Sequence, residues 1–354
     1  MYSETDLDTA VTAGVLNPEA VRSFRAHVAA GRESPLVDEE QFRLVTGFND
    51  IFVTIAIALL MVALAQIGST VTAALGGTLV AGAAWLLSEY FTRRRRMALP
   101  SIALLLAFVG GVAGALLGGL YEVTGEFTTG PFAPGAAAED SINPVAAILF
   151  AAIAALTALG AWLHWRRFHV PITIAAGAVA LVAVAVALLT AVLRSDETPW
   201  IGVFAGGVAT FVVAMRWDLS DRERRTRRSD VAFWLHLVAA PLIAHPIFHW
   251  LGVFDGMMGA GTAVVVLLLY MAFAALALAI DRRALLVSGL AYVLYAMTAL
   301  IRATGAVELS AAITALVIGS ALLCLSAFWQ RMRRPVIGAL GNIGQQLPPV
   351  AQPV

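Results

Sequence analysis

Lysine is absent from this 354-residue sequence, cysteine occurs once, and charged residues of both signs make up only 13% of the chain. A soluble domain carries about 25% charged residues, so this composition excludes an ordinary soluble protein. The single cysteine, Cys324, excludes a disulfide within the chain. All 23 basic residues are therefore arginines, which together with the abundance of alanine indicates a GC-rich bacterial genome.

Hydrophobic residues make up 60% of the chain, and its mean hydropathy is +0.84. The few charges gather in short blocks that separate long apolar runs. An α-helix of about 20 apolar residues spans the ~30 Å hydrocarbon core of a bilayer. The sequence therefore predicts an all-α, polytopic transmembrane bundle of about ten helices, at 49–68, 70–92, 98–119, 144–164, 170–193, 199–216, 231–254, 257–280, 284–302 and 307–329.

The connections between these runs alternate between basic and acidic or neutral. Together with the N-terminal segment, the basic ones carry 21 of the 23 arginines, and only Arg194 and Arg302 fall on the other side. Cytoplasmic loops of membrane proteins are enriched in basic residues, so both termini are predicted to be cytoplasmic (N-in/C-in), in a bacterial cytoplasmic (inner) membrane. The basic connections are 92–96, 164–169, 216–230, 281–283 and 330–334.

The chain divides by composition into a cytosolic N-terminal segment (1–46), the transmembrane bundle (47–335) and a flexible cytosolic tail (336–354). Asn17 before Pro18 is typical of a helix start, and the apolar spacing that follows predicts a helix over 18–30, with a second over 38–45. No basic stretch followed by an apolar one begins the chain, so we expect no cleavable signal peptide.

The apolar run 231–254 differs from the others because it contains three histidines and two prolines. His245 and His249 are four residues apart, which places them on one face of a helix. Pro241 and Pro246 each remove a backbone hydrogen bond, and unpaired carbonyls are costly in hydrocarbon. The pattern predicts a kinked, hydrated or hydrogen-bonded patch, and a candidate site for a ligand or a proton.

His236 lies nine residues before His245, closer to the cytoplasmic end, and is a further candidate. The alternative is that each histidine bonds to a neighbouring helix and only stabilises the bundle. A metal site would need more ligands, and no acidic partner is evident in the other runs, so no metal or cofactor is expected. Glu89, the last candidate, precedes Arg93 by four residues, which favours an ion pair at the membrane interface.

Glycine recurs every four residues at Gly110, Gly114 and Gly118, and small residues recur at Gly111, Ala115 and Gly119. Such stripes let another helix approach closely, either within this chain or in a homo-oligomer. The arginine-rich stretch 222–228 is short, contains acidic residues and adjoins the membrane. We therefore expect it to contact the bilayer and its anionic lipid headgroups, and expect no nucleic acid as partner.

The chain shows no phosphate-binding glycine loop, nucleophile elbow, zinc-protease helix or pair of catalytic carboxylates, so an enzyme is disfavoured. The leading hypothesis is transport of a small solute or ion, with a pocket near run 231–254. The alternative is a membrane scaffold or sensor that acts through residues 1–46.

The turn GVLNPEAV (14–21) in a short N-terminal segment, followed by hydrophobic helices joined by arginine-rich loops such as EYFTRRRRMALPS (89–101), defines a recognisable layout. In this layout the chain resembles a broad class of uncharacterised bacterial polytopic inner-membrane proteins. The resemblance covers most of the chain in pattern. It implies no activity and transfers no site residues.

Overall fold

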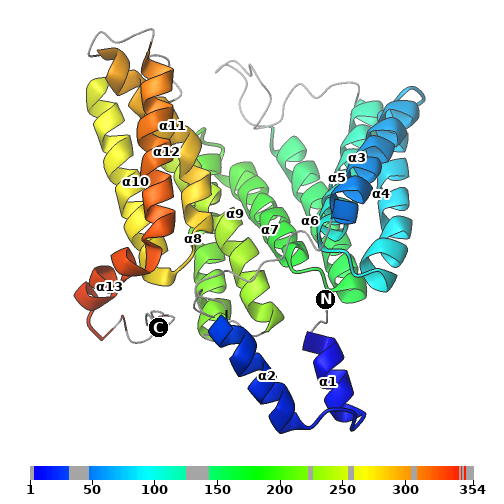
Figure 1. Ribbon diagram of the computed structural model, residues 1–354. Helices are drawn as coiled ribbons and strands as arrows, with labels where there is room; N and C mark the ends of the chain where they lie inside the picture. The colour runs from blue at the N-terminus through cyan, green and yellow to red at the C-terminus, as the bar shows by residue number, and fades with distance from the viewer. Residues whose placement is uncertain are drawn as a thin grey trace.

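The computed structural model describes residues 4–31, 48–124, 143–221, 226–253, 259–303, 309–342, 344 and 347. Within these residues the protein is all-α, as predicted (Figure 1). The elements are α1 (Glu4–Thr12), α2 (Pro18–Gly31), α3 (Phe48–Ser69), α4 (Ala73–Ser88), the π-helical segment η1 (Glu89–Arg94), α5 (Ala98–Thr124), α6 (Pro144–Phe168), α7 (Ile172–Leu193), α8 (Thr198–Leu219), α9 (Arg227–Trp250), α10 (Ala260–Ile280), α11 (Ala284–Ala303), α12 (Ser310–Ala327) and α13 (Trp329–Ala339).

Eight of the described helices are long and apolar enough to cross a membrane: α3, α5, α6, α7, α8, α9, α10 and α12. Large apolar side chains point away from the bundle, among them Leu59, Leu268 and Leu323, which are 65–73% exposed. The remaining two predicted runs coincide with α4, which η1 continues, and with α11. The protein is thus a multi-pass membrane protein, and the count of ten passes stays a prediction.

The helices α3 to α12 run alternately in opposite directions, and α1, α2 and α13 lie at the same end of the bundle (Figure 1). Contacts across the molecule also bring the basic connections together at this end. Glu89 at the end of α4 pairs with Arg167 at the end of α6, and Arg282 after α10 pairs with Asp218 at the end of α8. The alternation of basic and neutral connections therefore corresponds to two different ends of one bundle.

The helix α9 is the most enclosed of the candidate spans, with 50% of its apolar window buried. It covers Arg227–Trp250 and not 231–254, so the predicted bounds are wrong by four residues. Gly252 explains the end: it adopts φ 67°, its N–H bonds to the carbonyl of His249, and the N–H of Val253 bonds to that of Phe248. This pattern is a Schellman motif, which terminates a helix.

The small-residue stripe of α5 packs on α4 within this chain. A Cβ added at Gly111 would lie 2.6 Å from the amide nitrogen of Ala81, and one at Gly118 would lie 2.5 Å from that of Ala74. These approaches are closer than any side chain permits, so the contact requires glycine. Around Gly110 there is nothing within 4 Å of an added Cβ.

The predicted stripe is therefore divided between two environments. Gly118 contacts α4, Gly114 lies in ordinary contact distance of Gly77, and Gly110 is exposed. The structure thus assigns part of the stripe to packing within the chain. A homo-oligomer through these glycines stays a prediction, and Gly110 is the member that remains open for it.

The N-terminal helix predicted over 18–30 is confirmed as α2, and the Asn17 side chain accepts a hydrogen bond from the N–H of Glu19 at 2.9 Å. The helix predicted over 38–45 lies outside the described residues. Neither α1 nor α13 was predicted. Since α13 crosses from the predicted bundle into the predicted tail, the boundary at 335 stays a prediction.

Candidate functional site

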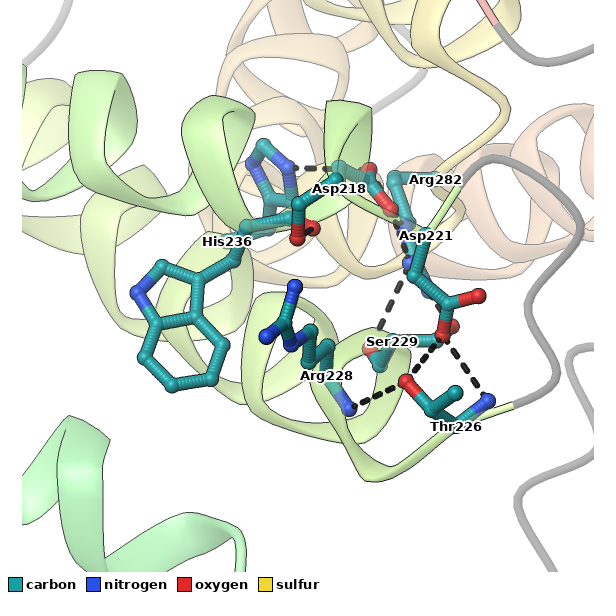
Figure 2. Close-up of polar contacts among 9 residues, drawn as sticks. Asp218, Asp221, Thr226, Arg228, Ser229, His236 and Arg282 are labelled. Carbon is teal, nitrogen blue, oxygen red and sulfur yellow. Dashed lines mark hydrogen bonds and ion pairs between the residues drawn. The ribbon is translucent and has the colours of Figure 1, made fainter.

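A cluster of charged side chains is buried where α8, α9 and the turn between α10 and α11 meet (Figure 2). Arg282, from that turn, binds the carboxylate of Asp218 on α8 twice: Nε donates to Oδ2 at 3.0 Å, and Nη2 donates to Oδ1. Nη2 also donates to the Ser229 hydroxyl at 3.1 Å. Asp218 is only 2% exposed and Arg282 only 1%. The two hydrogen bonds between the guanidinium and the carboxylate pair the opposite charges at a position with little access to water.

The buried face of α8 explains why Asp218 points inward. Thr210, Ala214 and Asp218 follow at intervals of four residues, and all three are buried. The predicted end of this helix at residue 216 and the predicted connection 216–230 are wrong, since α8 ends at Leu219 and α9 begins at Arg227. The helix continues to Leu219, so its inward face carries one more residue, and that residue is the carboxylate.

The short connection between α8 and α9 is held by Asp221 and Thr226 (Figure 2). Oδ2 of Asp221 accepts from the Thr226 N–H at 2.9 Å and from its hydroxyl at 2.7 Å. The Thr226 hydroxyl oxygen in turn accepts from the N–H of Arg228 at 3.2 Å. Thr226 is thus the N-cap of α9, which is why the helix begins at Arg227.

His236 of α9 joins the same cluster. Its ring is fully buried, its Nε2 lies 3.4 Å from Oδ2 of Asp218, and the Phe211 ring meets it edge-on with centroids 5.2 Å apart. Asp218 is therefore an acidic partner for one of the predicted histidines. The sequence pattern does not indicate this partner, because Asp218 falls within the predicted connection 216–230.

The turn between α10 and α11 also contacts α13. Asp281, which ends α10 with a left-handed φ of 59°, accepts a hydrogen bond from Nε1 of Trp329 at 2.7 Å. Arg333 is fully buried and donates from Nε to the carbonyl of Leu278 at 3.0 Å. The residues Asp281 and Arg282 thus connect α8 and α9 with the last helix of the bundle.

The other two histidines lie near the opposite end of α9. Nδ1 of His245 is hydrogen-bonded to the hydroxyl of Tyr292 on α11. His249 stacks on Trp200 of α8, with ring centroids 4.0 Å apart and planes 20° from parallel. Next to them, Nε1 of Trp250 donates to Glu197 at 3.0 Å. The two histidines share a helix face, as predicted, and both contact the Trp200 ring, whose centroid also lies 5.5 Å from that of His245.

Glu89 forms the predicted ion pair with Arg93, at 3.2 Å, and a closer one with Arg167 of α6, at 2.6 Å. The first pair follows from the spacing of four residues along one helix. The second joins residues 78 positions apart, which no local pattern contains. Glu89 thus ties the end of α4 to the end of α6.

The structure brings His236 together with Asp218 and Arg282, and keeps both His245 and His249 at the other end of α9. Among the described residues, no group of three or more His, Cys, Asp or Glu side chains is placed to hold a metal ion. The histidines of α9 thus lie in two places along an enclosed helix, His236 beside Asp218 and the pair His245 and His249 beside Trp200, and each contacts a side chain of α8 or α11.

These features define the class of protein, an integral multi-pass membrane protein of helical architecture. Comparison of the chain with models of protein families, with curated proteins and with solved structures finds no match.

Proposed function

We propose that this protein transports a small solute or an ion across the membrane, and that α9 lies along the pathway. The observation that carries the proposal is the placement of ionisable groups at both ends of this helix, which is the most enclosed of the candidate spans. Ionisable residues inside a membrane are costly and commonly mark a pathway for ions or protons.

At the basic end of the bundle, the pathway would meet His236 and the pair Asp218–Arg282. The carboxylate of Asp218 lies 3.4 Å from Nε2 of His236, and a proton on this ring would face that carboxylate. Protonation of His236 would therefore alter the balance of charge around Asp218 and Arg282. Such a change is a means of coupling proton binding to a rearrangement of the helix ends.

In the middle of α9, Pro241 and Pro246 interrupt the backbone hydrogen bonding. The helix α8 comes especially close there, since a Cβ added at Gly207 would lie 2.8 Å from the carbonyl carbon of Leu242. A helix with missing backbone bonds bends at lower cost than an uninterrupted one. The centre of α9 is thus the place where a rearrangement between its two ends is easiest.

The proposal includes the orientation and the location of the protein. We place the basic end of the bundle in the cytoplasm of a bacterium, with the bundle in the inner membrane, because arginine-rich connections stay on the cytoplasmic side. The arginine-rich stretch 222–228 would then face the anionic headgroups of the inner leaflet.

Thiol accessibility tests whether α9 borders a water-filled pathway. The native Cys324 is first replaced by serine, and His245→Cys and His249→Cys are then introduced one at a time. We expect both new thiols to react with a charged, membrane-impermeant methanethiosulfonate in intact membranes, because a pathway admits water to this face of α9.

Two further positions serve as the negative and the positive control for this experiment. Leu268→Cys, on an apolar residue that is 65% exposed, faces lipid and should stay unreactive, whereas Ser195→Cys in an exposed connection should react. If the thiols at 245 and 249 stay as unreactive as the one at 268 from both sides of the membrane, α9 is dry and the transport proposal fails.

A scaffold or sensor that acts through residues 1–46 is the second candidate. Three large apolar residues in the described part of this segment are exposed, Val15 at 75%, Leu16 at 38% and Phe24 at 53%, and exposed apolar side chains favour a partner surface. Deletion of residues 1–46 would then abolish crosslinking to a partner in cells while membrane insertion stays intact. The same deletion would leave the thiol accessibility of α9 unchanged.

A further inference from the structure

A pocket of about 530 Å³ opens at the basic end of the bundle. Three segments that are distant in sequence line it: the turn from η1 into α5, the turn from α6 into α7, and the start of α9. None of the three histidines of α9 lines it, so this pocket is separate from the site described above.

Four arginines line the pocket, namely Arg93, Arg96, Arg167 and Arg227, against a single lining carboxylate, that of Asp230. Arg93 and Arg167 share Glu89 as their partner. Among the described residues, Arg96 and Arg227 form no ion pair or hydrogen bond within bonding distance, and Arg227 interacts with the Asp230 carboxylate through space. The positive charges of the four arginines outnumber the negative charges of Asp230 and Glu89. The pocket thus carries a net positive charge, which favours an anionic occupant.

Backbone and hydroxyl groups of the pocket also suit an anion. The helices α5 and α9 begin at lining residues and α7 begins directly after them. The N-terminal end of a helix favours negative charge, although some of the first N–H groups already have partners here, among them that of Arg228 with the Thr226 hydroxyl and that of Thr173 with the carbonyl of Val170. Thr92 lines the pocket and is only 9% exposed, yet its hydroxyl has no hydrogen-bond partner among the described residues. A buried donor without a partner is costly unless a ligand satisfies it.

Apart from Ser101 and His169, the rest of the lining is apolar. Ile102, Phe168, Val170 and Trp234 belong to it, and the same residues pack together in a hydrophobic cluster with Leu105. The pocket therefore has a basic part and an apolar part. It lies at the ends of the membrane helices, at the level of the lipid headgroups. Tryptophan and arginine side chains are common at this level.

We propose that this pocket binds a phosphate group. Guanidinium groups bind phosphate oxygens at two points, and Arg96 and Arg227 are the arginines available for this purpose. The apolar part favours a phosphate that is carried by a lipid, such as that of an anionic phospholipid, with the start of its acyl region against Ile102 and Trp234. A soluble phosphate offers the same group without the apolar part.

The full-length protein, purified in a neutral maltoside detergent, allows both sources of phosphate to be compared. Phosphatidylglycerol or inorganic phosphate is titrated separately, and binding is measured as retained adducts in native mass spectrometry and as the shift of the melting temperature. We expect saturable binding that falls about tenfold or more in the double variant Arg96→Gln/Arg227→Gln, since each charge-assisted hydrogen bond contributes about this much.

The double variant Arg94→Gln/Arg166→Gln is the matched control, because it removes the same charge from exposed arginines that do not line the pocket. It should retain binding within about twofold, because removing surface charges away from a site has little effect. Loss of phosphatidylglycerol binding in the first variant alone identifies a lipid as the source, and loss of inorganic phosphate binding identifies a soluble one. Equal affinity of both variants for each ligand, or no saturable binding to either, would overturn the proposal.

Discussion

Asp218 shows how a single side chain changes the interpretation of its neighbours. In the sequence it stands in a connection rich in arginine and aspartate, where charges are usually solvated. In the structure it is 2% exposed and contacts His236 and Arg282, which lie 18 and 64 positions further along the chain. A buried charge of this kind is retained only with partners, because an unpaired one carries a large desolvation penalty.

Removing one partner of this pair should destabilise the protein strongly. We expect Asp218→Ala to lower the free energy of unfolding by about 3–5 kcal/mol, because it leaves the Arg282 guanidinium buried without a counter-charge. Denaturant titration of the purified protein in detergent, followed by circular dichroism, measures this change.

Two further variants separate the loss of the pair from the loss of a carboxylate. Asp196→Ala removes an exposed aspartate and should change stability by no more than about 0.5 kcal/mol. The double variant Asp218→Leu/Arg282→Met removes both charges and should recover most of the loss, since apolar replacements of buried pairs are commonly tolerated. A double variant no more stable than Asp218→Ala alone would contradict the proposed balance of charges.

The histidines of α9 show what residue spacing predicts and what it leaves open. The interval of four residues correctly places His245 and His249 on one face. It does not reveal that Tyr292 bonds the first and Trp200 stacks on the second. Their partners lie on α11 and α8, and only the packing of helices decides which side chains meet.

At the level of the elements, the contact between α4 and α5 depends on glycine at defined positions. A Cβ at Gly77 of α4 would lie 2.2 Å from the amide nitrogen of Ala115, and one at Gly111 of α5 would lie 2.6 Å from that of Ala81. The neighbouring atoms are backbone atoms, which cannot turn aside as a flexible side chain can. The two helices therefore approach to backbone contact.

Adjacent glycines of α5 provide a direct comparison. Gly111→Leu should destabilise the bundle by about 1–3 kcal/mol, as overpacking of an interior does, whereas Gly110→Leu meets open space and should be nearly neutral. Unfolding by sodium dodecyl sulfate, followed by tryptophan fluorescence, measures both. Equal losses in the two variants would mean that α5 does not pack on α4 in the way described.

The Gly110→Leu variant also addresses the predicted homo-oligomer. If the exposed part of the glycine stripe contacts a second copy of the chain, this variant shifts the protein towards the monomer, because leucine holds the helices apart. Size-exclusion chromatography with light scattering detects the shift. An unchanged distribution would remove Gly110 from any contact between subunits.

At the level of the whole molecule, the gathering of the arginine-rich connections at one end supports a definite orientation. Alkaline phosphatase is active only outside the cytoplasm, so its fusion after Gly135 should be active and its fusion after Ser229 inactive. The reverse activities would place the arginines outside the cell. That outcome would also place the phosphate-binding pocket on the outer face of the membrane.

Composition and periodicity determined that this is a helical membrane protein, where its apolar runs lie, and which connections share an end of the bundle. These properties follow from local chemistry: apolar length, helix caps and the sign of charges. The sequence also identified α9, because histidines and prolines are costly within an apolar run.

The tertiary structure alone decided which residues act together. It buried Asp218 and Arg282 beside His236, separated this histidine from His245 and His249, and formed an open basic pocket beside the starts of α5, α7 and α9. The physical reason is that each of these arrangements depends on contacts between helices distant in the chain. Periodicity fixes the face on which a side chain lies, and packing fixes what that face meets.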